Sequence, residues 1–181
     1  MGKSGDISIF FCTFAASNEK RLTSSDKNMN TFIGNTEARA DEKGRIFVPA
    51  AYRKILAEAG SRHIIMRRDT DNECLVFYPE QVWNEKVQSL RAALDEWDPE
   101  DQLILMEFMA DAEILDTDSQ GRILLQKKYF ETIGASQDVL FVGMLDRFAL
   151  WNPQTFADRR AGSRELADKI RERMHRAAKN E

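Results

Sequence analysis

One short pattern, present twice, constrains the fold of this chain more than any other feature. The segment ARADEKGRIFVPAAY at 38–52 returns 77 positions later as LDTDSQGRILLQKKY at 115–129, and both copies contain Asp-x-x-Gly-Arg before an apolar run. A second pair of segments, ECLVFYP at 73–79 and RFALWNP at 147–153, follows at an offset of 74. Two ordered matches separated by one loop of different length indicate an internal repeat, which sets the fold.

Each repeat is expected to fold as strand, turn, strand, helix, strand, turn and strand. In the Asp-x-x-Gly-Arg turn, Gly44 and Gly121 would supply the positive φ that reverses the chain, and Asp41 and Asp118 would cap the turn backbone. A unit of roughly 45 residues would be marginal alone, so the copies are expected to bury each other's apolar faces around a pseudo-twofold axis. Short aliphatic runs predict buried strands at 46–48 and 123–125. Short helices are expected at 50–59 and 127–133, followed by strands at 63–66 and 74–78 in the first repeat and at 139–142 and 148–151 in the second.

Further helices are predicted between and after the repeats. Pro79 and Pro153 suit the first position of a helix, and Asp98 followed by Pro99 is a strong helix-start signal. A last helix, at about 163–179, has only a thin apolar stripe among many charges. The helix after Pro99 is expected to turn five apolar residues toward the second repeat: Leu103, Ile104, Met106, Phe108 and Met109.

Charge is unevenly distributed along the chain. Twelve Asp and Glu stand against two basic residues between positions 80 and 118, whereas eight Lys and Arg stand against five acidic residues from 158 to the end. The formal net charge of −4 argues against a non-specific binder of polyanions but allows a basic patch on one face. Cys12 and Cys74 lie outside any metal-ligand spacing, which favours a reduced, cytoplasmic compartment. No apolar run approaches the ~18 residues of a membrane span.

Residues 1–28 differ in composition from the rest of the chain. They contain the apolar run ISIFFCTFAA at 7–16, followed by a polar stretch. A secretory signal peptide is one interpretation, although the basic n-region is poor and no Ala-x-Ala site follows. The alternative is a disordered leader, or one that stems from an overlong gene start, with Met29 as the natural first residue.

The sequence contains no recognisable catalytic arrangement. His63 and His175 lie near no nucleophile–base pattern, and glycine-rich phosphate loops and paired metal ligands are missing from the sequence. Asp41 and Asp118 could form an acid–base dyad, but each has an Arg four residues on that would hold the carboxylate ionised. We therefore expect no enzyme, no cofactor, no metal and no small-molecule substrate.

The arginine of the first turn, Arg45, has two interpretations. A surface ion pair with the turn aspartate would contribute only about 0–1 kcal/mol. Alternatively, Arg39, Lys43 and Arg45 alternate and would lie roughly on one face, with Arg53 and Lys54 on the helix beyond. Such a basic face suits phosphates and guanine edges, so we expect Arg45 to contact DNA with Asp41 orienting it.

The second turn differs in its charges. Arg122 is flanked by Asp116, Asp118 and Gln120, which favours the ion pair there, although Lys127 adds positive charge nearby. One basic patch neutralises too few phosphates for tight binding to duplex DNA. Homo-oligomerisation would repeat the patch and allow repeated half-sites to be read at a set spacing.

Four segments, in order, resemble the MraZ family of bacterial transcriptional regulators over about 29–156: FIGNTEARADEKGRIFVPAAYRKIL, ECLVFYP, DSQGRILL and FVGMLDRFALW. The resemblance implies two SpoVT-AbrB (swapped-hairpin) repeats, a ring-shaped oligomer, and binding to short direct repeats upstream of the division and cell-wall gene cluster. The family often has a proline soon after the second Gly-Arg-Ile, where this chain has Gln-Lys-Lys at 126–128. How closely the second helix start copies the first is therefore open. The DNA-facing motifs implied are Asp41, Lys43, Gly44 and Arg45, then Asp118, Gly121 and Arg122.

The sequence thus predicts an α+β protein with a mainly β core, a pseudo-twofold swapped-hairpin AbrB-like β-barrel with connecting and C-terminal helices. Its segments are a leader (1–28), a first repeat (35–81), a helical connector (82–110), a second repeat (111–154) and a C-terminal helix (155–181). The expected function is sequence-specific, autoregulatory binding of double-stranded promoter DNA by a cytoplasmic, nucleoid-associated, ring-like homo-oligomer. The alternative is an antitoxin-like protein-interaction module. The predicted DNA-binding residues are Arg39, Asp41, Lys43, Gly44, Arg45, Arg53, Arg122 and Lys127, with Asp118 and Gly121 as turn residues.

Overall fold

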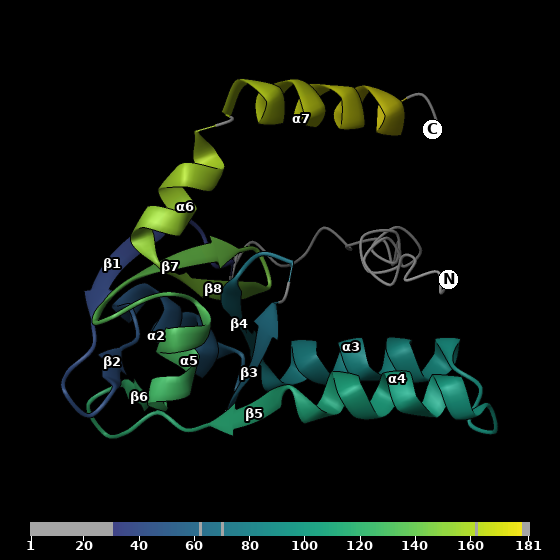
Figure 1. Cartoon of the computed structure of the whole chain (residues 1–181), viewed down its shortest axis with the longest axis horizontal. Helices are drawn as coiled ribbons and strands as arrows, with labels where there is room; N and C mark the ends of the chain where they lie inside the picture. Colours follow the sequence, from purple (N-terminus) through teal and green to yellow (C-terminus); the bar gives the residue numbers. More distant parts are fainter. Residues whose placement is uncertain (1–30, 62, 70, 162, 179–181) are drawn as a thin grey trace, which may run out of the picture.

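The computed structural model describes residues 31–61, 63–69, 71–161 and 163–178, so the leader 1–28 and Met29 lie outside it. The described chain is an α+β fold with a mainly antiparallel sheet, which confirms the predicted class (Figure 1). None of its helices combines the length and apolar character needed to cross a bilayer. Its elements are β1 (Asn35–Arg39), β2 (Arg45–Phe47), α2 (Ala50–Glu58), β3 (Ile64–Asp69), β4 (Cys74–Pro79), α3 (Glu80–Ala93), α4 (Pro99–Ala110), β5 (Ala112–Leu115), β6 (Arg122–Leu124), α5 (Lys127–Thr132), β7 (Asp138–Met144), β8 (Arg147–Trp151), α6 (Pro153–Arg160) and α7 (Ser163–Ala178).

The strands pair within each repeat, as the hairpins β3–β4 and β7–β8, and also across the two repeats. The large sheet has the order β1-β7-β8-β4-β3-β5, so the first strand of each repeat lies beside a strand of the other repeat. The small sheet consists of β2 and β6, with Ile46 opposite Ile123. These two residues are equivalent in the repeats, so the pseudo-twofold axis passes between them. Burial of each copy against the other is therefore built into the strand order.

Side chains of the large sheet alternate between two apolar clusters, as the period of a β-strand requires. The inner cluster joins Phe77, Phe141 and Phe148 to Ile46 and Ile123 of the small sheet and also includes buried residues of α2 and α5. The outer cluster is covered by α3, α4 and α6, whose contributions are Trp83, Phe108 and Phe156. The small sheet, too short to be stable alone, is thus held by burial of its isoleucines, each contributing about 1.5–3 kcal/mol.

Three sequence predictions about helices need correction. Pro79 is the last residue of β4 and the N-cap of α3, whereas Pro153 does occupy the first turn of α6. The prediction that five apolar residues of α4 turn toward the second repeat is wrong, because Phe108 is the only buried residue of this helix. The segment 155–181, expected as one C-terminal helix, contains parts of two, α6 and α7; α7 agrees with the helix predicted at about 163–179 and stands away from the sheets (Figure 1).

One local prediction about a helix start holds, and one question that the sequence left open is answered. The Asp98 side chain accepts hydrogen bonds from the backbone N–H groups of Glu100 and Asp101, so it caps α4 as its sequence signal indicates. Gln126, at the N-cap position of α5, has φ −68° and ψ 150°, close to the φ −51° and ψ 138° of Pro49 before α2, and neither side chain makes a capping hydrogen bond. The second helix start therefore copies the first without a proline.

Candidate nucleic-acid interface

The first Asp-x-x-Gly-Arg turn is closed by its own aspartate. One carboxylate oxygen, Oδ1 of Asp41, accepts hydrogen bonds from the backbone N–H groups of Lys43 (2.9 Å) and Arg45 (3.0 Å). The other oxygen, Oδ2, contacts Nε of Arg45 at 2.6 Å and Nη2 at 2.5 Å. Gly44 has φ 82°, the positive value that the turn requires. The aspartate therefore fixes both the turn and the direction in which the guanidinium leaves it.

The second turn repeats this geometry. Asp118 accepts from the backbone of Gln120 (2.9 Å) and Arg122 (3.0 Å), and its Oδ2 contacts Nε of Arg122 at 2.8 Å and Nη2 at 2.7 Å. Gly121 has φ 80°. The predicted caps and glycine conformations are confirmed in both copies.

Both turn carboxylates are strongly acidic. The hydrogen bond from the Arg45 side chain, followed by that from its backbone, lowers the pKa of Asp41 from 3.8 to about 2. The corresponding bonds from Arg122 lower the pKa of Asp118 to about 2 as well. A carboxyl group with such a pKa stays ionised near neutral pH and is a weak base, so neither aspartate is suited to acid–base catalysis.

The lowered pKa values predict how stability depends on pH. Ionised Asp41 and Asp118 stabilise the fold fully above about pH 4, and this contribution is lost as the pH falls toward about 2. We expect natural protein to exceed the double variant Asp41→Asn, Asp118→Asn in unfolding free energy by a constant amount from about pH 7 to 5, and the difference to shrink between about pH 4 and 2. Urea titrations at each pH measure it, and a difference that survives undiminished at pH 2 would refute the ionised clamp.

The two turns are joined by a short antiparallel ladder. Beyond the three residue pairs of β2 and β6, the backbone N–H of Val48 donates to the carbonyl of Gly121 (3.1 Å), and that of Leu125 donates to the carbonyl of Gly44 (2.9 Å). Because the strands are antiparallel, the turns lie at opposite ends of this ladder. We call β2, β6 and the two turns the ribbon.

One face of the ribbon is buried and the other is open. Ile46 and Ile123 are fully buried, whereas Phe47 and Leu124 are 54% and 56% exposed. The predicted burial of these strands holds for one face only, because the ribbon is covered on one side and its side chains alternate. Arg45 lies opposite Leu124, and Phe47 lies opposite Arg122, on whose guanidinium its ring packs at 5.6 Å. The open face thus combines two clamped arginines with two apolar side chains.

A further basic side chain, contributed by the other repeat, lies beside each turn. Arg53 of α2 donates from Nε to the carbonyl of Val48 (3.1 Å) and lies over Gly121, where an added Cβ would come within 2.6 Å of Nη1. Lys127 of α5 lines a pocket of about 260 Å³ together with Lys43 and Gly44. From the sequence, Arg53 was expected near the first turn and Lys127 near the second. In the structure Arg53 lies beside the second turn and Lys127 beside the first, because each strand of the ribbon runs toward the turn of the other repeat.

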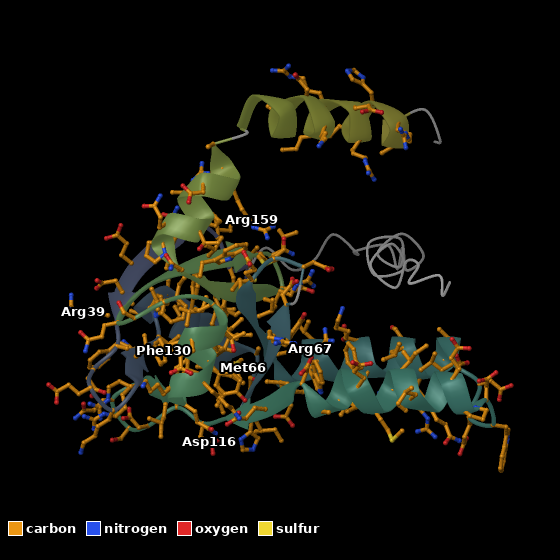
Figure 2. All side chains as sticks on the ribbon, viewed as in Figure 1. Arg39, Met66, Arg67, Asp116, Phe130 and Arg159 are labelled. Atoms are coloured by element: carbon orange, nitrogen blue, oxygen red, sulfur yellow. The ribbon has the colours of Figure 1, made fainter. Side chains whose placement is uncertain are left out.

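The predicted common face of Arg39, Lys43 and Arg45 is interrupted. Arg39 belongs to β1 in the large sheet, and the turn separates it from β2, so strand alternation does not run through all three. Its guanidinium contacts Asp138 (3.1 Å) and Gln137 (2.9 Å), and Figure 2 shows it at the edge of the molecule. Lys43 is exposed at the tip of the turn.

The two ends of the ribbon are similar but not equal. The Arg122 side chain is 20% exposed, against 37% for Arg45. The position equivalent to Arg53 is Phe130, whose ring lies beside Gly44 and, as Figure 2 shows, inside the fold. A carboxylate lies near the second turn, where Asp116 contacts Nδ1 of His63 at 2.6 Å. The first end therefore presents the more accessible guanidinium.

Chemically, the ribbon is a preformed donor surface. A guanidinium has more N–H donors than its contacts with the aspartate use, and the clamp leaves it pre-oriented. A two-stranded ribbon also has the width that the major groove of B-DNA admits. Phe47 and Leu124 were not singled out from the sequence, although alternation from the buried isoleucines would have placed them on the open face.

Comparison with known proteins points to one family. The family model described as "MraZ protein, putative antitoxin-like" matches residues 31–105 and 108–177. The chain is 44% identical over 123 residues to the Transcriptional regulator MraZ of Bacteroides fragilis, covering 68% of this chain and 78% of that protein. It is 41% identical to the protein of that name from Phocaeicola vulgatus (76% and 82% covered) and 33% identical to that from Proteus mirabilis (69% and 82%).

Proposed function

Because the chain belongs to the MraZ family, we propose that it is a transcriptional regulator that binds double-stranded DNA through its ribbon. The observation that carries the proposal is the open ribbon face, on which Arg45 and Arg122 are each held by an aspartate. Arg45 and Arg122 lie diagonally across from each other on the two strands of the ribbon. Diagonal neighbours in an antiparallel pair lie roughly 7–8 Å apart, so both guanidiniums reach the same stretch of a groove. Curated relatives carry the name transcriptional regulator, and this name agrees with such a surface.

In this proposal the residues of the ribbon have different tasks. Arg45 and Arg122 donate to base edges or phosphates, and the exposed Lys43 adds a phosphate contact at the first turn. Arg53 and Lys127, each beside the turn of the other repeat, and Arg39 at the sheet edge supply further positive charge. Asp41, Asp118, Gly44 and Gly121 hold the turns in shape.

We further propose the target and the assembly. The protein acts in the cytoplasm, on nucleoid DNA, at direct repeats in the promoter of the division and cell-wall gene cluster, and regulates its own expression. One chain brings few cations to a duplex, so tight binding calls for several ribbons in a ring-like homo-oligomer. These assignments come from the family resemblance and from this count of charges.

The fold assignment in this proposal is a pseudo-twofold swapped-hairpin barrel. Its support is the exchange of strands, with β1 paired to β7, β5 to β3 and β2 to β6. The segments proposed are the repeats 35–81 and 111–154, the connector 82–110 and the C-terminal segment 155–181. The family model also divides its match in two.

A protein-interaction module is the second candidate, because the family description includes the words antitoxin-like. The two candidates differ in what the ribbon touches. A partner module would need the exposed Phe47 and Leu124 as its contacts and would have no use for the free donors of the clamped arginines.

A mobility-shift assay with the DNA upstream of the protein's own gene tests the proposal. We expect a discrete shift that weakens steeply as salt is raised, since phosphate contacts release counterions. The assay is run with the full chain and with a chain that starts at Met29, and both are expected to bind. Scrambled DNA of the same length is the control. Equal affinity for both DNAs would contradict sequence-specific binding, and binding to neither would favour the partner module.

A further inference from the structure

The helix α7 has an apolar row that no other part of the described chain covers. Ile170 and Met174, one turn apart, are 51% and 70% exposed. In Figure 1, α7 is held by α6 away from both sheets. A helix of this length is marginal on its own in water and gains most of its stability from packing. The row therefore calls for a partner surface.

A second uncovered apolar row lies on α4. Phe108 packs on Trp83 of α3 with ring centroids 5.3 Å apart, and this contact holds α4 to the outer cluster. On α4, Leu103, Met106 and Met109 are 58%, 61% and 43% exposed. The exposed apolar residues of α4 recur every three positions, and those of α7 are four positions apart. Rows of side chains with these two spacings form the ridges that interdigitate when two helices cross at about 20°.

The two helices carry opposite charge. The hairpin of α3 and α4, residues 80–110, has eight Asp and Glu against Lys86 and Arg91. The α7 helix has five Lys and Arg against three acidic residues. Complementary charge around apolar rows steers association and fixes the register of a contact.

We propose that α7 of one copy packs on α4 of the next copy. In Figure 1 α7 lies at the top and α4 at the lower right, well apart from each other, so a contact between them joins different surfaces of different copies. Such a head-to-tail contact closes into a ring when the rotation per copy divides a full turn. The inference rests on the homo-oligomer proposed above and names its contact, and it does not depend on DNA binding.

Disulfide trapping between two kinds of chain tests the contact. One chain carries Met174→Cys and the other Met106→Cys, both with Cys12→Ser, while Cys74 stays because it is buried. We expect mild oxidation of the mixture to yield a disulfide-linked species with one chain of each kind. Glu172→Cys replaces Met174→Cys in the control, because it lies on the opposite face of α7, and should lose that product. No mixed species, equal trapping by the control, or closure within a chain carrying both cysteines would overturn the proposal.

Particle mass gives an independent readout. The double variant Ile170→Asp, Met174→Asp is expected to fall to the mass of a single chain, 20.8 kDa, in light scattering, with an unchanged circular dichroism signal from the sheets. An unchanged mass would refute the contact. Neither measurement contains DNA, so a trapped oligomer that gives no mobility shift would count against the DNA proposal alone.

Discussion

Replacing Arg45 with alanine is expected to abolish the mobility shift while the fold and the oligomer remain. Each lost guanidinium contact costs about 1–3 kcal/mol, and several ribbons of one oligomer engage the DNA together, so the affinity should fall by about 100-fold or more. The side chain is more than a third exposed and contributes little to stability, since its ion pair with Asp41 lies at the surface. Mobility shift, circular dichroism and light scattering on one preparation measure the three properties.

Two matched variants sharpen this test. Arg91→Ala removes the same charge from the exposed surface of α3, away from the ribbon, and should leave the shift intact. Arg122→Ala should weaken binding less than Arg45→Ala, because Arg122 is less exposed and packs on Phe47. Equal losses at Arg45 and Arg122 would mean that both ends of the ribbon read DNA alike. If Arg45→Ala failed to fold, the role of Arg45 would be to stabilise the turn and not to contact DNA.

The largest loss of stability is expected from Gly44→Ala. The residue has φ 82°, which costs an L-amino acid about 1–2 kcal/mol, and its new Cβ would lie 2.2 Å from the carbonyl oxygen of Leu125. That oxygen is backbone at the end of the ribbon and cannot move without disturbing the ladder. We expect a loss of about 3 kcal/mol or more in unfolding free energy, measured by chemical denaturation.

Two other glycines separate the conformational cost from the clash. Gly60 has φ 64° with nothing within 4 Å of an added Cβ, so Gly60→Ala should lose only about 1–2 kcal/mol. Gly121→Ala should fall between the two, because the atoms it meets belong to the flexible Arg53 side chain. The expected order of stability loss is Gly44, Gly121, Gly60. Equal losses at all three positions would show that the clash at Gly44 relaxes freely.

Local structure was predictable from the sequence because it depends on neighbouring residues. Asp41 and Gly44 determine the turn, and the turn recurs wherever the pattern does. The capping of α4 by Asp98 is equally local. Alternation also separates the two faces of the ribbon, although the run of three apolar residues at 46–48 concealed it.

Pairing between distant segments was not predictable in the same way. Alternation tells which face of a strand is buried but not which strand lies beside it, so the exchange of Arg53 and Lys127 between turns could not be derived from their positions in the sequence. The buried face of α4 was predicted wrongly because the sequence pattern of apolar residues three positions apart is the same whether these residues pack within the chain or remain exposed.

The exchange of strands also sets the order in which the chain can fold as it is synthesised. Among the described residues, β1 forms its ladder with β7, more than 100 positions later, and β2 with β6. The hairpin of β3 and β4 can form as soon as it leaves the ribosome, but β1 and β2 must wait for the second repeat. Pairings this distant in sequence make folding slow. Translation that stops in the connector would therefore release a hairpin with open edges, and the second repeat acts as the template on which the first is completed.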